Sequence, residues 1–591
     1  MAPTASSAPP PPAWPRHALW TGALLFAAVA LSALPTCSGY GITWDEPIYL
    51  EATRQVQTWL SLPAADRFNA PAIDRFWRTD PQRNVHPAGI KWLYLAARHS
   101  VFWESDPYIQ NRVLTVLLFA AALAVFCLWI AAGRPVLAWT TAALFLTLPR
   151  CFAHVHFAAT DSPMTALLLL LVPALDRGLA PRWAWIPGVL IGLAASFKIT
   201  AVILCAPLLA LFLACAYTDW KSCLARFWIV VLTAGIVFYL LNPDWWLTPW
   251  ARLGEFAGAT ASRRQWAPFS LLYFGQLYSY RGPFHYPLGI LLVTTPLIHL
   301  GLLVAGMLRL RLRPFRACCR HWAMVVGGAA PIVLLMVPFS PTNDMERYLL
   351  PAYPFLAAMM AVGLQPLWER FRPVGKPNGP VLHRVALAVM LSLAAGWTVS
   401  RSVRNHPREL CYFNEWVGGA AGGRRLGFEV TYWWEPLDDR ALASINRICR
   451  GSTVFFPIAP TDHYFRHMQQ SGRIAFVPVA NLGQARHALV YGRPFAEFWE
   501  SRLRDQLQQS GHTMALAWSS EWQGVPLLRL WTIHPANSRS PTGRSAVNGP
   551  VRPNEIPTQL VAGVCPDAIH SDAPASAITG VNRIRAIEES R

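Results

Sequence analysis

Residues 112–132 read RVLTVLLFAAALAVFCLWIAA, an apolar run in which Arg112, at the start, carries the sole charge. A helix needs about 20 mostly apolar residues to cross a bilayer, so this stretch predicts a transmembrane helix. Similar runs recur at roughly 18–36, 135–149, 161–176, 183–197, 199–217, 225–241, 286–308, 322–339, 349–366 and 383–400. The sequence therefore predicts a multi-pass α-helical membrane protein with about eleven transmembrane helices.

The composition supports a membrane protein and argues against a nucleic-acid partner. Charged residues make up 14% of the chain and hydrophobic residues 53%, whereas a soluble protein carries about 25% charged residues. The formal net charge is +19, but the basic residues are spread over loops between apolar runs rather than gathered on one face. The 27 Trp residues also suit a membrane protein, because Trp favours the membrane–water interface.

The basic residues also predict the orientation of the chain. If the N-terminus lies in the cytoplasm, every loop expected on the inner side carries Arg or Lys, as the positive-inside rule requires. The strongest cluster consists of Arg309, Arg311, Arg313, Arg316 and Arg320. We therefore expect a protein of the cell (inner) membrane, surrounded by membrane lipids, with its C-terminal segment outside.

Changes in pattern divide the chain into four parts. They are a disordered N-terminus at 1–16, a transmembrane part at 17–400, a small extracytoplasmic α/β domain at 401–537 and a disordered tail at 538–591. Long outer loops at about 37–111 and 242–285 are expected to contain short helices on the membrane surface. In the α/β domain we expect strands at 453–457, 474–479, 487–491 and 527–533, and a helix at 496–510.

Two adjacent carboxylates, Asp45 and Glu46, follow the first predicted span. They suit a helix N-terminus, with Asp45 as the cap and Pro47 in the first turn. They equally suit a functional site, because ionisable groups at the membrane edge of a bundle are candidates for function. Asp161 precedes another apolar run and is expected on the same outer side, so both interpretations apply to it as well.

Two further polar residues lie in the first outer loop. His86 could donate a hydrogen bond to a substrate, and Lys91 could pair with a phosphate. The alternative is a turn at Pro87 that starts an interfacial helix, with Lys91 in solvent. The sequence leaves both interpretations open.

His154 and His156 suggest a divalent metal site together with Asp161. The H-x-H spacing, however, suits a strand better than a helix, and no third histidine is tied to the pair. The sequence therefore calls for no cofactor, and a divalent metal stays an open alternative.

Lys198 and Arg347 are the cations expected at the outer rim. Lys198 stands between two apolar runs, which is a costly position in lipid, so it either reaches the outer surface or neutralises a phosphate. Arg347, followed by Tyr348, presents a planar fork of donors that suits phosphate. A salt bridge from Arg347 to Asp344 or Glu346 is the alternative.

Together these residues resemble the GT-C glycosyltransferases, in particular family 39, which includes protein O-mannosyltransferases and bacterial aminoarabinose and related lipid-A transferases. The resemblance covers about residues 18–435 and rests on the order and shared side of several short motifs. They are Asp45-Glu46, His86-Pro87, the turn from Pro149 to Asp161, Lys198, Arg347-Tyr348-Leu349-Leu350-Pro351 with Tyr353-Pro354, and Tyr412-Phe413-Asn414-Glu415 with Gly418-Gly419. At Tyr432-Trp433-Trp434-Glu435 the chain departs from the expected Asp-Trp-Gly pattern, which leaves Glu435 without a role.

The resemblance implies a transferase that moves a hexosyl or pentosyl group from a polyprenyl-phosphate carrier to an acceptor on the outer face of the membrane. The acceptor would be an envelope glycan, a lipid or a protein. Asp45 would be the general base, with Glu46 beside it, and Asp161 a second acidic catalytic residue. The remaining candidates would bind the donor: His86, Lys91, Lys198, Arg347 and Tyr348. Direct attack by the activated acceptor predicts inversion at the sugar carbon.

Two other functions compete with this one. A transporter or flippase for a lipid-linked substrate would also cross the membrane many times, but transporters usually show internal repeats and polar residues near the midplane. The chain shows neither pattern. A scaffold protein with an outer binding domain would not require the acidic pair at Asp45 or the cation at Arg347.

Overall fold

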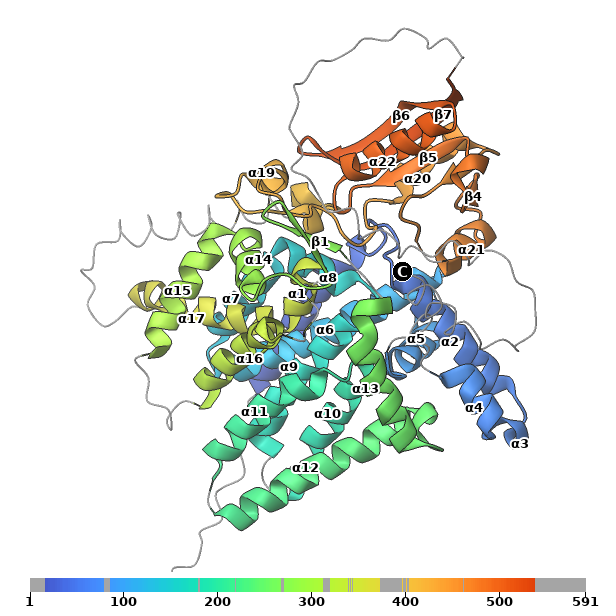
Figure 1. The fold of residues 1–591 in the computed structure, drawn as a ribbon. Helices are drawn as coiled ribbons and strands as arrows, with labels where there is room; N and C mark the ends of the chain where they lie inside the picture. Colours follow the sequence, from blue (N-terminus) through green and yellow to red (C-terminus); the bar gives the residue numbers. More distant parts are fainter. Residues whose placement is uncertain are drawn as a thin grey trace, which may run out of the picture.

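Figure 1 shows a body of helices with a small sheet-containing domain at one end. The computed structural model describes residues 16–78, 86–101, 103–178, 181–217, 219–266, 270–311, 319–338, 340, 342, 344–371, 396, 400, 403–460 and 462–536. The predicted disordered ends and most of the predicted span at 383–400 lie outside the described residues.

Apolar helices of different lengths form the body of the described chain. They are α1 (Arg16–Ala33), α6 (Pro107–Ala131), α7 (Pro135–Leu146), α9 (Asp161–Gly178), α10 (Trp185–Phe197), α11 (Ala201–Cys215), α12 (Trp220–Leu241), α14 (Tyr286–Thr294), α15 (Leu297–Arg311), α16 (Cys319–Met336) and α17 (Tyr353–Phe371). Within the described ranges, five helical segments are long and apolar enough to cross a membrane, and seven if each bent pair counts as one span. The multi-pass helical architecture is confirmed, and the count of about eleven stays a prediction.

Two of the expected spans are bent. The run predicted at 135–149 forms α7 and then α8 (Pro149–His156), at 84° to each other. Pro149 lies in the first turn of α8, where the missing N–H of proline costs nothing. The second bend, of 119°, separates α14 from α15. The first bend has a direct consequence for the site, because α8 places His154 and His156 on a helix.

The two long loops that the sequence predicts on the outer side contain short helices, as expected. The first loop forms η1 (Leu34–Thr36), α2 (Glu46–Ser61), α3 (Ala64–Arg67), α4 (Ala70–Trp77) and α5 (Gly89–Ser100), and the second forms η3 (Pro243–Trp245) and α13 (Pro249–Trp266). The second loop also contains a hairpin that was not predicted, β1 (Ser270–Tyr273) with β2 (Gln276–Ser279). Its strands are too short to give a readable alternation.

The C-terminal domain is α/β, as the sequence predicts. Its elements are α20 (Asp439–Cys449), β3 (Thr453–Phe455), α21 (Asp462–Gln470), β4 (Val477–Val479), β5 (His487–Tyr491), α22 (Ala496–Gln509), β6 (His512–Trp522) and β7 (Val525–Pro535). The sheet order is β4-β3-β5-β7-β6, with β3 parallel to β4 and β5, and β7 antiparallel to β5 and β6. Strand β6 was not predicted, because it is a half-exposed edge strand without a continuous apolar run.

The C-terminal domain packs on the first of these two long loops. One apolar cluster joins Ile42 and Tyr108 to side chains of the domain such as Leu489. The amide of Gly41 also donates to the carbonyl of Glu435 at 3.1 Å. A Cβ at Gly41 would lie 2.6 Å from the carbonyl oxygen of Leu437, so this close approach requires glycine. The contact fixes the start of α2, and with it Asp45, against the domain.

Candidate functional site

Arg347 is the centre of the candidate site. It lies in η5 (Met345–Ala352), the short helix that leads into α17. Its Nη2 donates to Oδ2 of Asp45 at 2.6 Å, and its Nε donates to Oδ2 of Asp161 at 2.7 Å. The third donor, Nη1, lies 3.2 Å from Oδ2 of Asp344. The guanidinium group also stacks on the ring of Trp433, 4.3 Å from its centroid, so its orientation is set on all sides.

Lys198 extends this arrangement through Asp161. Its Nζ donates to Oδ1 of Asp161 at 2.7 Å and lies 4.4 Å from the ring centroid of Tyr348. Asp161 therefore uses one oxygen for each cation. We call Asp45, Asp161, Lys198, Arg347 and Tyr348 the rim cluster. All five were predicted from the sequence.

The ends of the helices bring the rim cluster together. Asp45 immediately precedes α2, Asp161 is the first residue of α9, Lys198 immediately follows α10, and Arg347 lies just before α17. The shared sidedness predicted from the sequence is therefore present in the fold. Asp45 occupies the N-cap position of α2 but makes no capping hydrogen bond, since its side chain turns to Arg347 instead.

Asp45 is the most accessible member of the ion-pair network. Its side chain is 18% exposed, against 3% for Asp161 and 6% for Arg347. Burial raises the pKa of Asp45 above its usual range, although Arg347 acts in the opposite direction. A carboxylate with a raised pKa is a stronger base, and partial exposure lets a second molecule reach it. Asp45 thus has the properties of a proton acceptor, and Asp161 those of a group that holds the two cations.

Glu46 does not join the rim cluster. Its two oxygens accept from Nε and Nη2 of Arg112, both at 2.7 Å. They also accept from the amide and hydroxyl of Thr43, at 2.8 and 3.0 Å, and from the amide of Ala158 at 3.2 Å. Both partners of this pair are buried. The carboxylate is fully occupied in tying α6 to the start of α2, so the geometry gives Glu46 a structural place.

Lys91 and His86 also lie outside the rim cluster. Lys91 is buried in α5, where its Nζ donates to the carbonyl of Trp77 at 3.3 Å and lies 5.3 Å from the ring centroid of Trp77. Burial lowers the pKa of Lys91 to about 8. The ring of His86 packs 6.0 Å from that of Tyr49, centroid to centroid. Lys91 is therefore not in solvent, the alternative that the sequence left open, and its role toward a phosphate stays a prediction.

The two histidines of α8 do not converge on Asp161. Nε2 of His154 lies 2.9 Å from the hydroxyl of Tyr432, and Nε2 of His156 lies 2.8 Å from that of Thr36. Across the described part of the chain, no group of three or more His, Cys, Asp or Glu side chains could hold a metal ion. These residues do not fit the divalent metal that the sequence left open.

A second buried network, which the sequence did not reveal, lies beside the first. Glu346 accepts from Nη1 of Arg150 at 2.6 Å and from the hydroxyl of Tyr432 at 2.8 Å. The sequence offered Asp344 and Glu346 as alternative partners of Arg347, and the fold gives that place to Asp344. A lone Arg in an apolar turn, such as Arg150, signals a buried acidic partner, but the partner is 196 residues away along the chain.

Glu435 supports the turn that contains Trp433. Glu435 accepts from the hydroxyl of Thr431 at 2.6 Å and from the amide of Trp433 at 3.1 Å. It therefore braces the turn that presents the ring of Trp433 to Arg347. In the segment where the resemblance predicts an Asp-Trp-Gly pattern, the ring of Trp433 stacks on Arg347.

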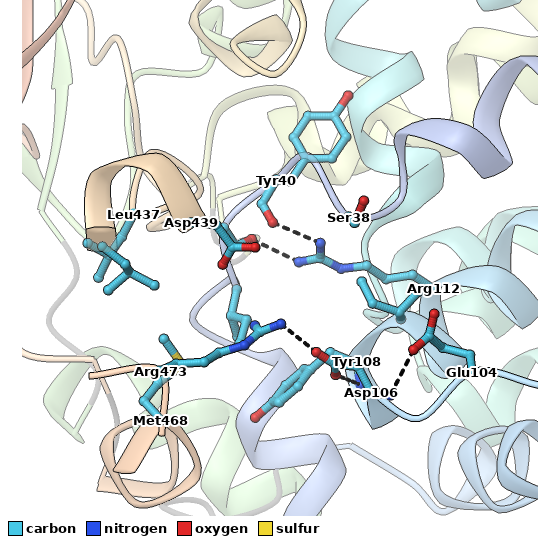
Figure 2. Close-up of a pocket in the computed structure, with 14 residues that line it drawn as sticks. Ser38, Tyr40, Glu104, Asp106, Tyr108, Arg112, Leu437, Asp439, Met468 and Arg473 are labelled. Carbon is cyan, nitrogen blue, oxygen red and sulfur yellow. Dashed lines mark hydrogen bonds and ion pairs between the residues drawn. The ribbon is translucent and has the colours of Figure 1, made fainter. Parts of the chain in front are cut away.

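A separate polar cavity of about 220 Å³ lies between the first long loop, the start of α6 and the C-terminal domain (Figure 2). At this cavity Arg473 of the domain donates to Asp106 at 2.6 Å. Arg112 also lines the cavity, but its guanidinium is occupied by Glu46 and by backbone carbonyls. No member of the rim cluster lines this cavity, so the two places are distinct.

No family model matches the chain, and no curated protein matches it. Among solved structures it is similar to ArnT from Cupriavidus metallidurans in the apo state, with a TM-score of 0.46 and 15% identity, over 89% of this chain and 100% of that one. For the same protein bound to undecaprenyl phosphate, the values are 0.45 and 14%, over 86% and 97%. The archaeal oligosaccharyltransferase AglB from Archaeoglobus fulgidus, in complex with an inhibitory peptide and a dolichol-phosphate, gives 0.41 and 13%, over 82% and 69%. These proteins are of the GT-C class that the sequence motifs resemble. At such scores and identities the likeness decides no activity, and the function rests on the site.

Proposed function

We propose that the protein is a membrane glycosyltransferase that moves a sugar from a polyprenyl-phosphate carrier to an acceptor hydroxyl at the outer face of the cell (inner) membrane. The observation that carries this proposal is the rim cluster. It combines an accessible carboxylate, Asp45, with two cations, Lys198 and Arg347, at the ends of membrane helices. A lipid-linked donor explains why such a site lies at the rim of a bundle.

In this proposal, the donor phosphate binds to Arg347 and Lys198. Arginine presents a fork of donors that matches phosphate oxygens, and lysine supplies a compact charge. Asp161 orients both cations before the donor arrives. The phosphate takes over Nη2 of Arg347, which releases Asp45 from its ion pair.

The released carboxylate then acts on the acceptor. The acceptor oxygen attacks the anomeric carbon of the sugar, a new C–O bond forms, and the hydroxyl proton passes to Asp45. The bond between the sugar and the phosphate oxygen breaks, and its electron pair leaves with the polyprenyl phosphate. Arg347 and Lys198 stabilise the charge that develops on that oxygen. A single displacement of this kind inverts the configuration at the sugar carbon.

A transporter or flippase without chemistry remains the rival function. Transporters bind their substrate near the bilayer midplane, whereas the rim cluster lies where helices end. The ion-pair network also supplies an acid–base group that transport alone does not need. The geometry therefore favours transfer, to an envelope glycan, a lipid or a protein.

The test compares cell envelopes by mass spectrometry, with and without the gene. We expect one glycan, lipid or protein to lose a hexosyl or pentosyl increment when the gene is absent. Arg347→Gln should fail to restore it. Arg320→Gln is the matched control, because Arg320 pairs with Asp176 at 3.2 Å away from the rim cluster; it should restore the product. An unchanged envelope, or full activity of Arg347→Gln, would refute the proposal.

A further inference from the structure

Besides Trp433, a second side chain from the C-terminal part of the chain approaches the rim cluster. Arg493 follows strand β5, and its Nη1 lies 3.0 Å from Oδ1 of Asp344. The same nitrogen donates to the carbonyl of Tyr432 at 2.6 Å. Nε of Arg493 lies 3.6 Å from Oε1 of the buried Glu429. Arg493 is thus anchored within its own part of the chain and extended toward the membrane helices.

Asp344 connects Arg493 to the rim cluster. One of its oxygens faces Arg493, and the other faces Nη1 of Arg347 at 3.2 Å. Asp344 has a φ of 65°, in the left-handed region that few residues other than Gly, Asn and Asp adopt. Two arginines, Arg347 and Arg493, hold its carboxylate in place. The Asp344 carboxylate therefore pairs with one arginine of the C-terminal domain and one of the rim cluster.

We propose that Arg493 is a positioning residue of the donor site, acting on Arg347 through Asp344. This inference rests on the proposed function. Arg347 contacts three carboxylates, from Asp45, Asp161 and Asp344, and a phosphate must compete with them. Because Asp344 also pairs with Arg493, it binds Arg347 less strongly, and Arg347 is more available to the phosphate. The same contact fixes the orientation of the Arg347 guanidinium group.

The proposal gives the C-terminal domain a place in the reaction. Its docking carries Arg493 to the rim, so a movement of the domain changes the electrostatics of the phosphate site directly. The same interface also offers a matched control. Arg473 pairs with Asp106 of the outer loop at 2.6 Å, and this contact lies at the separate cavity of Figure 2 rather than at the rim cluster.

The experiment measures the affinity of the purified full-length protein for undecaprenyl phosphate. We expect Arg493→Gln to weaken binding about tenfold, since one charge-assisted contact of about 1.4 kcal/mol corresponds to that factor. Arg493→Lys, which keeps the charge but not the fork, should lie between Arg493→Gln and the wild type. Arg473→Gln should bind like the wild type. Thermal unfolding of each variant checks that the domain remains folded.

Three outcomes overturn the inference. The first is wild-type affinity in Arg493→Gln, or in Arg493→Lys if the Gln variant does not fold. The second is an equal loss in Arg473→Gln, which would assign the effect to docking alone. The third is a wild-type protein that does not bind undecaprenyl phosphate, or binding that Arg347→Gln does not weaken; this result also removes the proposed function, whereas the first two leave it intact.

Discussion

Asp45 and Glu46 are neighbours in the chain, and the fold gives them different surroundings. Glu46 is matched one to one with Arg112, and both of its oxygens are occupied. Asp45 shares Arg347 with Asp161 and Asp344 and is partly exposed. One ion pair is closed, and the other is shared.

The difference separates a structural ion pair from one that can exchange partners. In the closed pair, removal of either group leaves a buried charge that no opposite charge balances. In the shared network, Arg347 has three carboxylates in competition, so an incoming phosphate can replace one of them. We therefore expect mutations in the closed pair to change stability, and mutations in the rim cluster to change binding and transfer.

Glu46→Gln breaks the closed pair and should have the largest effect on stability. Loss of one partner of a buried ion pair costs about 3–5 kcal/mol, so the unfolding temperature should fall sharply. The measurement is thermal unfolding of the purified protein, with transfer expressed per folded molecule. A variant with normal stability but no transfer would show that Glu46 acts in catalysis rather than in stability.

Glu429→Gln sharpens the comparison with a buried carboxylate that its cation, Arg493, approaches only to 3.6 Å. Burial raises the pKa of Glu429 from 4.5 to about 7, more than Arg493 lowers it. The folded protein therefore holds this proton more tightly than the unfolded chain, and the resulting stabilisation is full below pH 4.5 and lost as the pH rises through 7.

The variant lacks this titration. Above pH 8, Glu429→Gln should gain roughly 1–3 kcal/mol over the wild type, relative to their difference at pH 4. Unfolding temperatures between pH 4 and 9 give the measurement. A difference between the two proteins that does not change with pH would show that Glu429 titrates normally.

Lys198→Gln weakens the shared network without dismantling it. Asp161 keeps its contact with Arg347, so the fold should persist, while one cation for the phosphate is lost. We expect the affinity for undecaprenyl phosphate to fall about tenfold, or about 1.4 kcal/mol. Lys221→Gln is the control, because Lys221 is exposed at the start of α12 and is not part of the rim cluster. Equal affinities of Lys198→Gln and the wild type would remove Lys198 from the donor site.

The smallest expected effect is on the pH profile of transfer. Asp45 must be ionised to accept a proton, and burial raises its pKa. As the pH falls, activity should therefore be lost at a pH above the ordinary value of about 3.9 for Asp. A profile of initial rates from pH 4 to 8 provides the test, and a rate that is constant down to pH 4 would exclude Asp45 as the base.

Much of the fold is readable from the sequence because membrane helices obey a simple length rule. The apolar run at 112–132 becomes α6, and strand β5 appears at the predicted residues. The bends at α7–α8 and α14–α15 could not be read in this way, because an apolar run has the same composition whether it is straight or broken. Edge strand β6 lacks an apolar signature for a related reason, since half of its side chains face solvent.

The candidate site could also be predicted only in part. Asp45, Asp161, Lys198 and Arg347 could be predicted because a charge at the end of an apolar run requires an explanation. Their pairing could not, since each contact joins residues far apart in the chain. For the same reason the sequence grouped Glu46 with Asp45, when Arg112 lies 66 residues further on and takes Glu46 away.

The most direct test of the account is sugar transfer by Asp45→Asn, measured per folded molecule, with undecaprenyl phosphate binding measured on the same sample. A general base contributes about 10²- to 10⁴-fold in rate, so transfer should fall by that factor. Binding should be at least as tight as in the wild type, because the phosphate no longer competes with a charged Asp45 for Arg347. Wild-type transfer, or transfer and binding lost together in a folded protein, would contradict the account.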